Sequence, residues 1–153
     1  MTGAVLTYWR ELATPVPVPR FPVGITRRRF DAAAASAAHA LLADAYANGF
    51  GAVPGFGRWH TSLVADAEYD PELCFYFADG ANPVAFALIW TSGFIKDFAV
   101  AAAYRRQGIG RTMLSTVFSG LRARGITEVG LKVHAENHAA IALYEACGMR
   151  RSG

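Results

Sequence analysis

A short stretch rich in arginine and glycine follows a predicted strand and opens a predicted helix. It consists of Arg105, Arg106, Gln107, Gly108, Ile109, Gly110 and Arg111. The first turn of a helix leaves about four backbone N–H groups without internal partners, and the aligned peptide dipoles place roughly half a positive charge there. Glycines let a ligand come close to this backbone, and arginine side chains add positive charge. The stretch therefore predicts a cradle for an anion, and for a phosphate in particular.

Two widespread nucleotide-binding patterns do not fit this stretch. The pattern G-x-x-x-x-G-K-[ST] lacks its lysine, because Arg111 follows Gly110, and Arg105 stands at the place of its first glycine. The pattern G-x-G-x-x-G would need a third glycine where Met113 stands. The sequence therefore predicts a phosphate ligand, but one bound in neither of these two ways.

The elements that must position this stretch follow from the spacing of hydrophobic residues. Strands are predicted at 5–9, 24–29, 73–78, 84–90, 94–100 and 128–133, and helices at 31–47, 61–67, 109–121 and 137–147. The order of strand 94–100, helix 109–121 and strand 128–133 implies a right-handed crossover and a parallel strand pair. The predicted fold class is mixed α/β: a mainly antiparallel sheet with one parallel pair, flanked by helices.

Two motifs in this frame resemble the GNAT superfamily of acyl-CoA-dependent N-acetyltransferases. The residues from Arg105 to Gly110 match its pyrophosphate loop, [QR]-x-x-G-x-[GA]. The residues from Leu131 to Met149 match L-x-V-x-x-x-N-x-x-A-x-x-L-Y-x-x-x-G-[FM]. The resemblance covers residues 23–149. It implies a GNAT-like fold with a splayed parallel strand pair, and direct transfer of an acetyl group from acetyl-CoA to a primary amine of a small molecule, peptide or protein.

The resemblance also implies which residues bind the cosubstrate. Phe98, Ala99 and Val100 would run beside the pantetheine arm of acetyl-CoA, with the backbone of Phe98 and Val100 paired to its amides. The backbone N–H groups from Arg106 through Arg111 would hold the pyrophosphate. Asn137 matches a family position near the pantetheine, and it is equally suited to capping the last helix.

Tyr144 matches the usual general acid of the family. When an amine attacks the thioester, the leaving CoA thiolate needs a proton, and a phenol can donate one. The resemblance also suggests that a backbone N–H at the strand break, that of Phe98, meets the oxyanion.

The base that deprotonates the amine is left open between Asp97, His60, His134 and a water. Lys96 stands where many family members carry a glutamate. The acceptor itself is expected near the loop 49–59 and the region 59–68, where the candidate lining residues are Phe50, Phe56, Trp59 and His60.

The amino-terminal part differs in composition from the rest. Residues 1–22 are predicted to form a strand and a Pro-rich linker, and residues 23–153 a GNAT-like domain. Family members usually continue past the position of Gly148 and Met149 with two more strands. Because a bare sheet edge invites aggregation, we expect the segment Val5–Trp9 to fill that place, in its own subunit or in a partner. A homodimer is therefore one expected state.

Composition excludes several other classes. Hydrophobic residues make up 53% of the chain and charged residues 18%, which is the opposite of the balance found in a disordered chain. No apolar run approaches the ~18 residues that cross a bilayer, and residues 1–5 do not resemble a secretory signal. A single-domain, soluble, cytoplasmic protein is expected.

Charge and cysteine content narrow the range of expected ligands and partners. The net charge is +3, with 13 of the 15 basic residues arginine, but these are scattered along the chain, so nucleic acid is not an expected partner. Cys74 and Cys147 lack the spacing of a metal site, and no metal is expected. The rival function is an acyl-CoA-binding sensor or scaffold without transferase activity.

Overall fold

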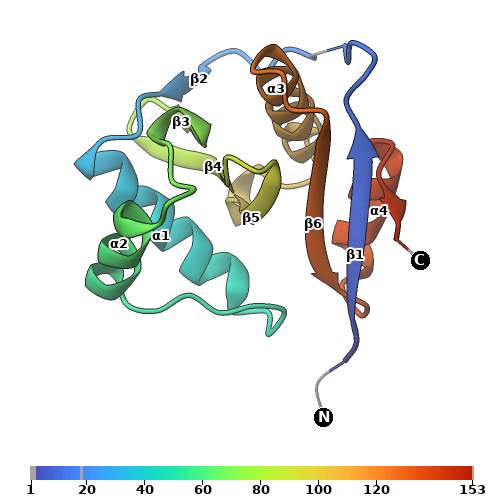
Figure 1. The fold of residues 1–153 in the computed structure, drawn as a ribbon. Coiled ribbons are helices and arrows are strands. Elements are labelled where there is room, and N and C mark those ends of the chain that lie inside the picture. The colour runs from blue at the N-terminus through green and yellow to red at the C-terminus, as the bar shows by residue number, and fades with distance from the viewer. Residues whose placement is uncertain (1–2, 18, 153) are drawn as a thin grey trace.

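The computed structural model describes residues 3–17 and 19–152, so the predictions for the first two residues and for Val18 in the Pro-rich segment lie outside the described residues. Within these ranges a mixed sheet has the strand order β2-β3-β4-β5-β6-β1-β7 (Figure 1). Its strands are β1 (Val5–Glu11), β2 (Ile25–Arg28), β3 (Cys74–Asp79), β4 (Asn82–Ile89), β5 (Phe94–Val100), β6 (Glu128–His134) and β7 (Arg150–Arg151). The helices are α1 (Ala32–Tyr46), α2 (Phe56–Ala65), α3 (Ile109–Ala123) and α4 (His138–Ala146), with short 3-10 turns η1 (Pro71–Leu73) and η2 (Ala102–Tyr104).

The local sequence accounts for most of these boundaries. Asp31 caps α1, because its side chain accepts a hydrogen bond of 2.9 Å from the N–H of Ala34. The helix α2 begins at Phe56, five residues before its predicted start, with Gly55 as its N-cap. The earlier start brings Trp59 and Leu63, four residues apart, onto one buried stripe, and this packing outweighs the loop-like composition around Gly57.

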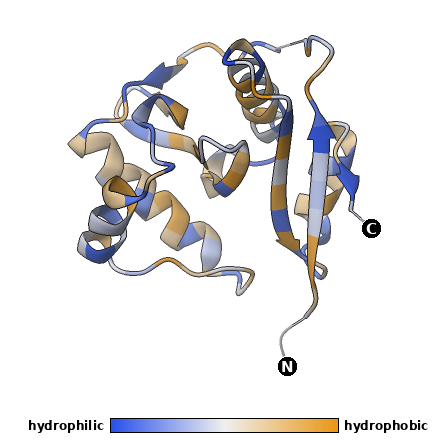
Figure 2. Ribbon diagram, viewed as in Figure 1, coloured by the Kyte–Doolittle hydropathy of each residue, from blue (hydrophilic) through white to orange (hydrophobic). Residues whose placement is uncertain are grey.

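Each face of the sheet carries its own hydrophobic core. Phe86 and Leu88 of β4 pack in one cluster with residues of α1 and α2, whereas Ala85 and Ala87 pack in the other with residues of α3. The strand β4 is therefore covered on both faces, while β6 shows alternating hydrophobic and hydrophilic residues (Figure 2).

The only parallel pairing among the described strands is that of β5 with β6, and it is short. It comprises Phe94 opposite Gly130 and Ile95 opposite Leu131. At the same point the antiparallel register of β5 with β4 shifts, and Lys96 becomes an extra residue in β5. Such a bulge bends a strand and increases its twist. Beyond it β5 and β6 diverge, which confirms the expected splayed pair.

The far side of β6 is covered by the amino-terminal strand. β1 pairs antiparallel with β6 along its whole length, from Val5 opposite His134 to Glu11 opposite Glu128. β7 then pairs with β1 through Tyr8 and Trp9. The segment Val5–Trp9 therefore lies in the sheet of its own chain. The division into residues 1–22 and 23–153 stays a prediction.

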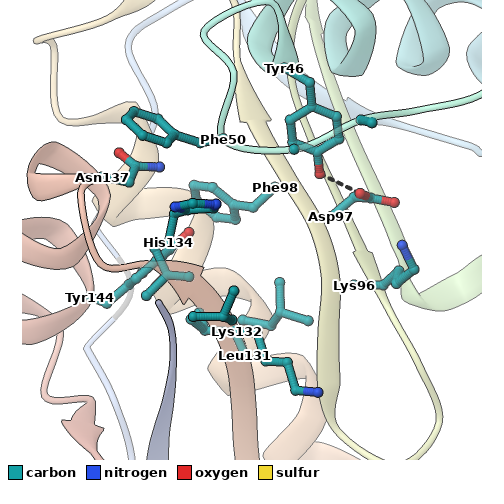
Figure 3. A pocket seen from close by; sticks show the side chains of 15 residues that line it. Tyr46, Phe50, Lys96, Asp97, Phe98, Leu131, Lys132, His134, Asn137 and Tyr144 are labelled. Atoms are coloured by element: carbon teal, nitrogen blue, oxygen red, sulfur yellow. Dashed lines mark hydrogen bonds between the residues drawn. The ribbon is translucent and has the colours of Figure 1, made fainter. Parts of the chain in front are cut away.

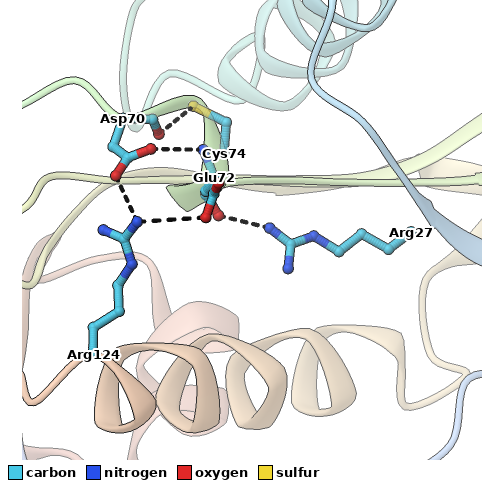
Figure 4. A network of polar contacts seen from close by, with 5 residues as sticks. All are labelled: Arg27, Asp70, Glu72, Cys74 and Arg124. Atoms are coloured by element: carbon cyan, nitrogen blue, oxygen red, sulfur yellow. Dashed lines mark hydrogen bonds and ion pairs between the residues drawn. The ribbon is translucent and has the colours of Figure 1, made fainter.

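A polar network holds the carboxyl end of α3 against the start of β3 (Figure 4). The Arg124 guanidinium lies 2.6 Å from a carboxylate oxygen of Asp70 and 3.7 Å from one of Glu72. The N–H of Glu72 and the Arg124 side chain together lower the pKa of Asp70. Arg27 donates to the carbonyl of Glu72 from β2.

In the described ranges no helix has the length and apolar character needed to cross a membrane.

Gly93 fixes the point where the parallel pair begins, so Gly93→Ala tests the frame of the site. The backbone has a φ of +93°, an added Cβ would collide with the carbonyl oxygen of Glu128, and the Gly93 carbonyl accepts the N–H of Gly130. We expect a loss of about 2 kcal/mol or more in unfolding free energy, measured by denaturant titration.

Gly57→Ala is the matched control. Gly57 lies inside α2, and an added Cβ would meet no atom within 4 Å. Alanine there should raise stability by about 0.5 to 1 kcal/mol, because it lowers the backbone entropy lost on folding. Equal effects of the two substitutions would contradict a special role for Gly93.

Candidate functional site

A cleft of about 320 Å³ opens where β5 and β6 diverge (Figure 3). Both strands, α4, the end of α1 and the loop after it contribute to its walls. The lining residues are Val5, Tyr46, Phe50, Gly51, Ala52, Ile95, Lys96, Asp97, Phe98, Leu131, Lys132, Val133, His134, Asn137 and Tyr144. Of the site residues that the sequence motifs single out, this cleft gathers Phe98, Asn137 and Tyr144, whereas Ala99, Val100 and residues 105–111 are not part of its lining.

The backbone edge of β5 faces this cleft. The N–H of Ala101 donates to the carbonyl of Val84 in β4, and backbone groups alternate in direction along a strand. The backbone groups of Phe98 and Val100 therefore point away from β4, to the side where β6 has already departed. One carbonyl there, that of Val100, accepts a hydrogen bond of 3.1 Å from the Arg105 Nε.

A row of backbone N–H groups continues from this edge. Within the part of the chain that the structure describes, the N–H groups of residues 106–111 donate to no other residue. Arg106 and Gly108 both have positive φ, 63° and 79°, which turns the chain sharply before α3 begins at Ile109. These donors sit at the positive end of the helix dipole, where an anion is favoured.

The side chains of the cradle are partly used to hold it in place. Arg111 donates to the carbonyl of Ala146 at the end of α4, and Gln107 to that of Ala103. Gly110 packs directly against α4, since an added Cβ would lie 3.1 Å from Leu143. The cradle, β5 and α4 are therefore connected as one unit.

Tyr144 projects from α4 into the cleft. Its side chain is 8% exposed, and its ring meets that of Phe98 edge-on at 6.2 Å between centroids. Burial raises the pKa of Tyr144 to about 12. Among the residues described, none forms a hydrogen bond with its hydroxyl, so this group is available to a ligand.

The helix α4 is itself anchored by the amino-terminal strand. The Tyr8 hydroxyl donates to the Glu145 carboxylate at 2.9 Å, and the Arg10 guanidinium donates to the carbonyl of Cys147 at 2.7 Å. Arg10 also lies over the ring of Phe118 in α3, at 5.3 Å. β1 therefore does more than cover an edge: it holds the helix that carries Tyr144.

Asn137 both caps α4 and lines the cleft. Its side-chain oxygen accepts a hydrogen bond of 3.4 Å from the N–H of Ala140, which caps α4, and the residue also lines the cleft. Capping and ligand contact are therefore compatible here.

The candidate bases are separated by the fold. Asp97 and His134 line the cleft, whereas His60 lies on α2, with its ring stacked on that of Phe56 at 5.4 Å.

Of the aromatic residues expected to surround an acceptor, Phe50 lines the cleft. Phe56 and Trp59 instead pack with His39 between α1 and α2.

Tyr46 is a lining residue that the sequence motifs do not reveal. It is the last residue of α1, and its hydroxyl donates a hydrogen bond to the Asp97 carboxylate (Figure 3). Ala38, Leu42 and Tyr46 follow one another at four-residue spacing, and the first two are fully buried. That spacing was the available signal that Tyr46 faces the sheet.

A family model described as the acetyltransferase (GNAT) family matches residues 26–149. The chain belongs to the GNAT acetyltransferase family. The GNAT family uses acetyl-CoA as cosubstrate.

In the described ranges, no three His, Cys, Asp or Glu side chains form a group that could hold a metal ion.

Similar GNAT proteins include a [ribosomal protein bS18]-alanine N-acetyltransferase of Escherichia coli strain K12, 32% identical over 97 residues. A mycothiol acetyltransferase of Thermobispora bispora is 28% identical over 157 residues. The matches cover 61% and 93% of this chain, but 66% and 52% of those two proteins. The chain thus spans about two thirds of one relative and about half of the other.

Solved GNAT structures have the same fold. A GCN5-related N-acetyltransferase from Sphaerobacter thermophilus superposes with a TM-score of 0.83 at 28% identity, over 97% of this chain and 48% of that one. The ribosomal-protein-S18-alanine N-acetyltransferase from Escherichia coli superposes with a TM-score of 0.68 at 27% identity, over 84% and 79% of the two chains.

Gly108→Ala tests the anion cradle. The position has positive φ, and an added Cβ would project into open space beside the free N–H row. Alanine strains this turn and crowds an approaching phosphate, so we expect acetyl-CoA binding to weaken about tenfold in calorimetry. Gly80→Ala is the matched control, because Gly80 also has positive φ and open space but lies in the β3–β4 turn. It should lose similar stability and keep its affinity for acetyl-CoA.

Proposed function

We propose that this chain is an acetyl-CoA-dependent N-acetyltransferase that transfers the acetyl group directly to a primary amine. The observation that carries the proposal is the continuity of two sets of backbone groups. The edge of β5 at Phe98 and Val100, where Arg105 holds the Val100 carbonyl, leads to the free N–H groups of residues 106–111. An extended amide-containing arm that ends in a pyrophosphate fits such a surface along its whole length.

Each part of this surface has a proposed role. Phe98, Ala99 and Val100 accompany the pantetheine arm, and Asn137 contacts it from the start of α4. The pyrophosphate lies on the N–H groups of residues 106–111, which include those of Arg106, Gln107, Gly108 and Ile109, and the charges of Arg105 and Arg111 are beside it.

The thioester supplies an acyl carbon open to attack by an amine, and a thiolate as leaving group. Tyr144 is proposed to donate its phenolic proton to that thiolate as the carbon–sulfur bond breaks. Its hydroxyl is free of other described partners and its ring is fixed against Phe98. The N–H of Phe98 is proposed to stabilise the oxyanion, because it points into the cleft.

The proton of the acceptor ammonium is proposed to leave to a group that lines the cleft. Asp97 and His134 both do so, and a water can serve between them and the amine. The acceptor class is a primary amine of a peptide, protein or small molecule. A cytoplasmic location and a homodimer stay predictions from the sequence.

Tyr144→Phe is the direct test of the mechanism. Release of free CoA thiol, measured across a panel of amines and peptides, should fall about a hundredfold in turnover number, because the leaving thiolate loses its proton donor. Calorimetric affinity for acetyl-CoA should stay within about twofold of wild type. Because burial raises the pKa of Tyr144 to about 12, the acid form persists at lower pH, and no loss of rate from its ionisation is expected below about pH 10.

Two outcomes would contradict the proposal. If wild-type protein does not bind acetyl-CoA, the cleft holds another ligand. If it binds acetyl-CoA tightly but releases thiol with none of the amines tested, a sensor or scaffold role replaces transfer. Unchanged turnover in Tyr144→Phe would remove Tyr144 from the chemistry and leave the transfer itself standing.

A further inference from the structure

Asp97 is a buried carboxylate at the cleft with few partners. Its side chain is 6% exposed. Among residues 3–17 and 19–152 it forms no ion pair, and its side chain has one hydrogen-bond donor, the hydroxyl of Tyr46. A carboxylate has about four acceptor positions, so most of its capacity is unused. Buried oxygens without donors are costly, so a ligand group that donates hydrogen bonds is favoured beside them.

Tyr46 holds one oxygen of the Asp97 carboxyl group by its hydrogen bond. The phenol lies at the end of α1, and the following loop folds back over its ring: an added Cβ on Gly51 would lie 2.9 to 3.2 Å from three ring carbons. Burial and the neighbouring Asp97 raise the pKa of Tyr46, so its hydroxyl stays a donor. With one oxygen of Asp97 held by this donor, the other can accept from the cleft.

The side chains on the two sides of the cleft lie on different faces of the sheet. Asp97 is opposite Leu88, whose side chain packs with α1, whereas Phe98 is opposite Ala87, which packs with α3. Opposite residues of an antiparallel pair share a face. Asp97 therefore belongs to the α1 face, while Phe98 and Tyr144 belong to the face of α3 and α4.

We infer that Asp97, held by Tyr46, is the subsite for the ammonium group of the acceptor, which enters from the α1 side. The inference rests on the proposed function and adds the acceptor's binding group and direction of entry. When the ammonium gives up its proton, the N–H electron pair stays on nitrogen and the proton forms an O–H bond at Asp97. The amine then faces a thioester on the opposite side of the sheet.

The other charges at the cleft narrow the acceptor class. Both lysines of the chain, Lys96 and Lys132, line the same cleft. A second positive charge on the acceptor would be repelled by them. The subsite therefore takes an amine with one positive charge and neutral or anionic neighbours, such as a peptide amino terminus, and discriminates against polyamines.

The first experiment measures acceptor binding without turnover. Alaninamide, its N-acetylated form and spermidine are titrated into wild-type protein, followed by NMR, with and without acetyl-CoA. We expect alaninamide to bind and the other two to bind at least tenfold more weakly. In Asp97→Asn the affinity for alaninamide should fall about ten- to hundredfold, the range for a hydrogen bond to a charged group.

The second experiment separates Tyr46 from a structural role. In Tyr46→Phe we expect the KM of the acceptor to rise about three- to tenfold, with the KM of acetyl-CoA unchanged. Tyr104→Phe removes a similar phenol–carboxylate contact, from Tyr104 to Asp79 at 3.4 Å, outside the cleft lining, and should leave the KM of the acceptor unchanged. Thermal melting of each variant checks that it is folded.

The outcomes distinguish this inference from the proposed function. If alaninamide binds wild type and Asp97→Asn equally, or binds no better than its acetylated form, the subsite is wrong even if acetyl transfer occurs. If alaninamide fails to bind while acetyl-CoA binds, the subsite is likewise wrong. If alaninamide binding depends on Asp97 but acetyl-CoA does not bind, the subsite stands and the proposed function fails.

Discussion

The parallel strands β5 and β6 separate after two residue pairs, and beyond that point their backbone donors and acceptors face a gap. The organisation of this protein follows from that separation. The bulge at Lys96 bends β5 away from β6, while Gly93 holds their starting points together. Backbone groups that leave a sheet still require partners. In the proposed function a ligand that carries its own amides satisfies them, and the opening that would weaken an ordinary sheet serves as the binding surface.

The same separation lets the two faces of the sheet share one site. In an unbroken sheet, side chains on opposite faces are kept apart by the strands between them. Here Asp97 on the α1 face and Tyr144 on the α4 side line one cleft. The Asp97 carboxyl group and the Tyr144 phenol, for which different roles are proposed, are thereby kept in different surroundings. The first is paired with Tyr46, and the second is buried, which raises its pKa.

Local sequence signals predicted the elements closest to the chemistry most accurately. β5 has the predicted bounds, and α3 begins at Ile109, because glycines and hydrophobic spacing mark both. The start of α2 was missed because Gly55 and Gly57 suggest a loop, and only tertiary packing of Trp59 makes the helix favourable. The contact of Tyr46 with Asp97 joins residues 51 positions apart. No pattern within either segment indicates that the two residues meet, so only the folded structure reveals the contact.

The placement of β1 also bears on the order in which the chain folds. Its seven residues pair with β6 over a separation of more than one hundred positions. Contacts of such long range slow folding, because the intervening chain must first lose its freedom. During synthesis the first strand emerges long before its partner and waits with both edges unpaired. Until β6 has been synthesised, the edge of β1 that faces it has no partner, and an unpaired strand edge is prone to aggregation over that interval.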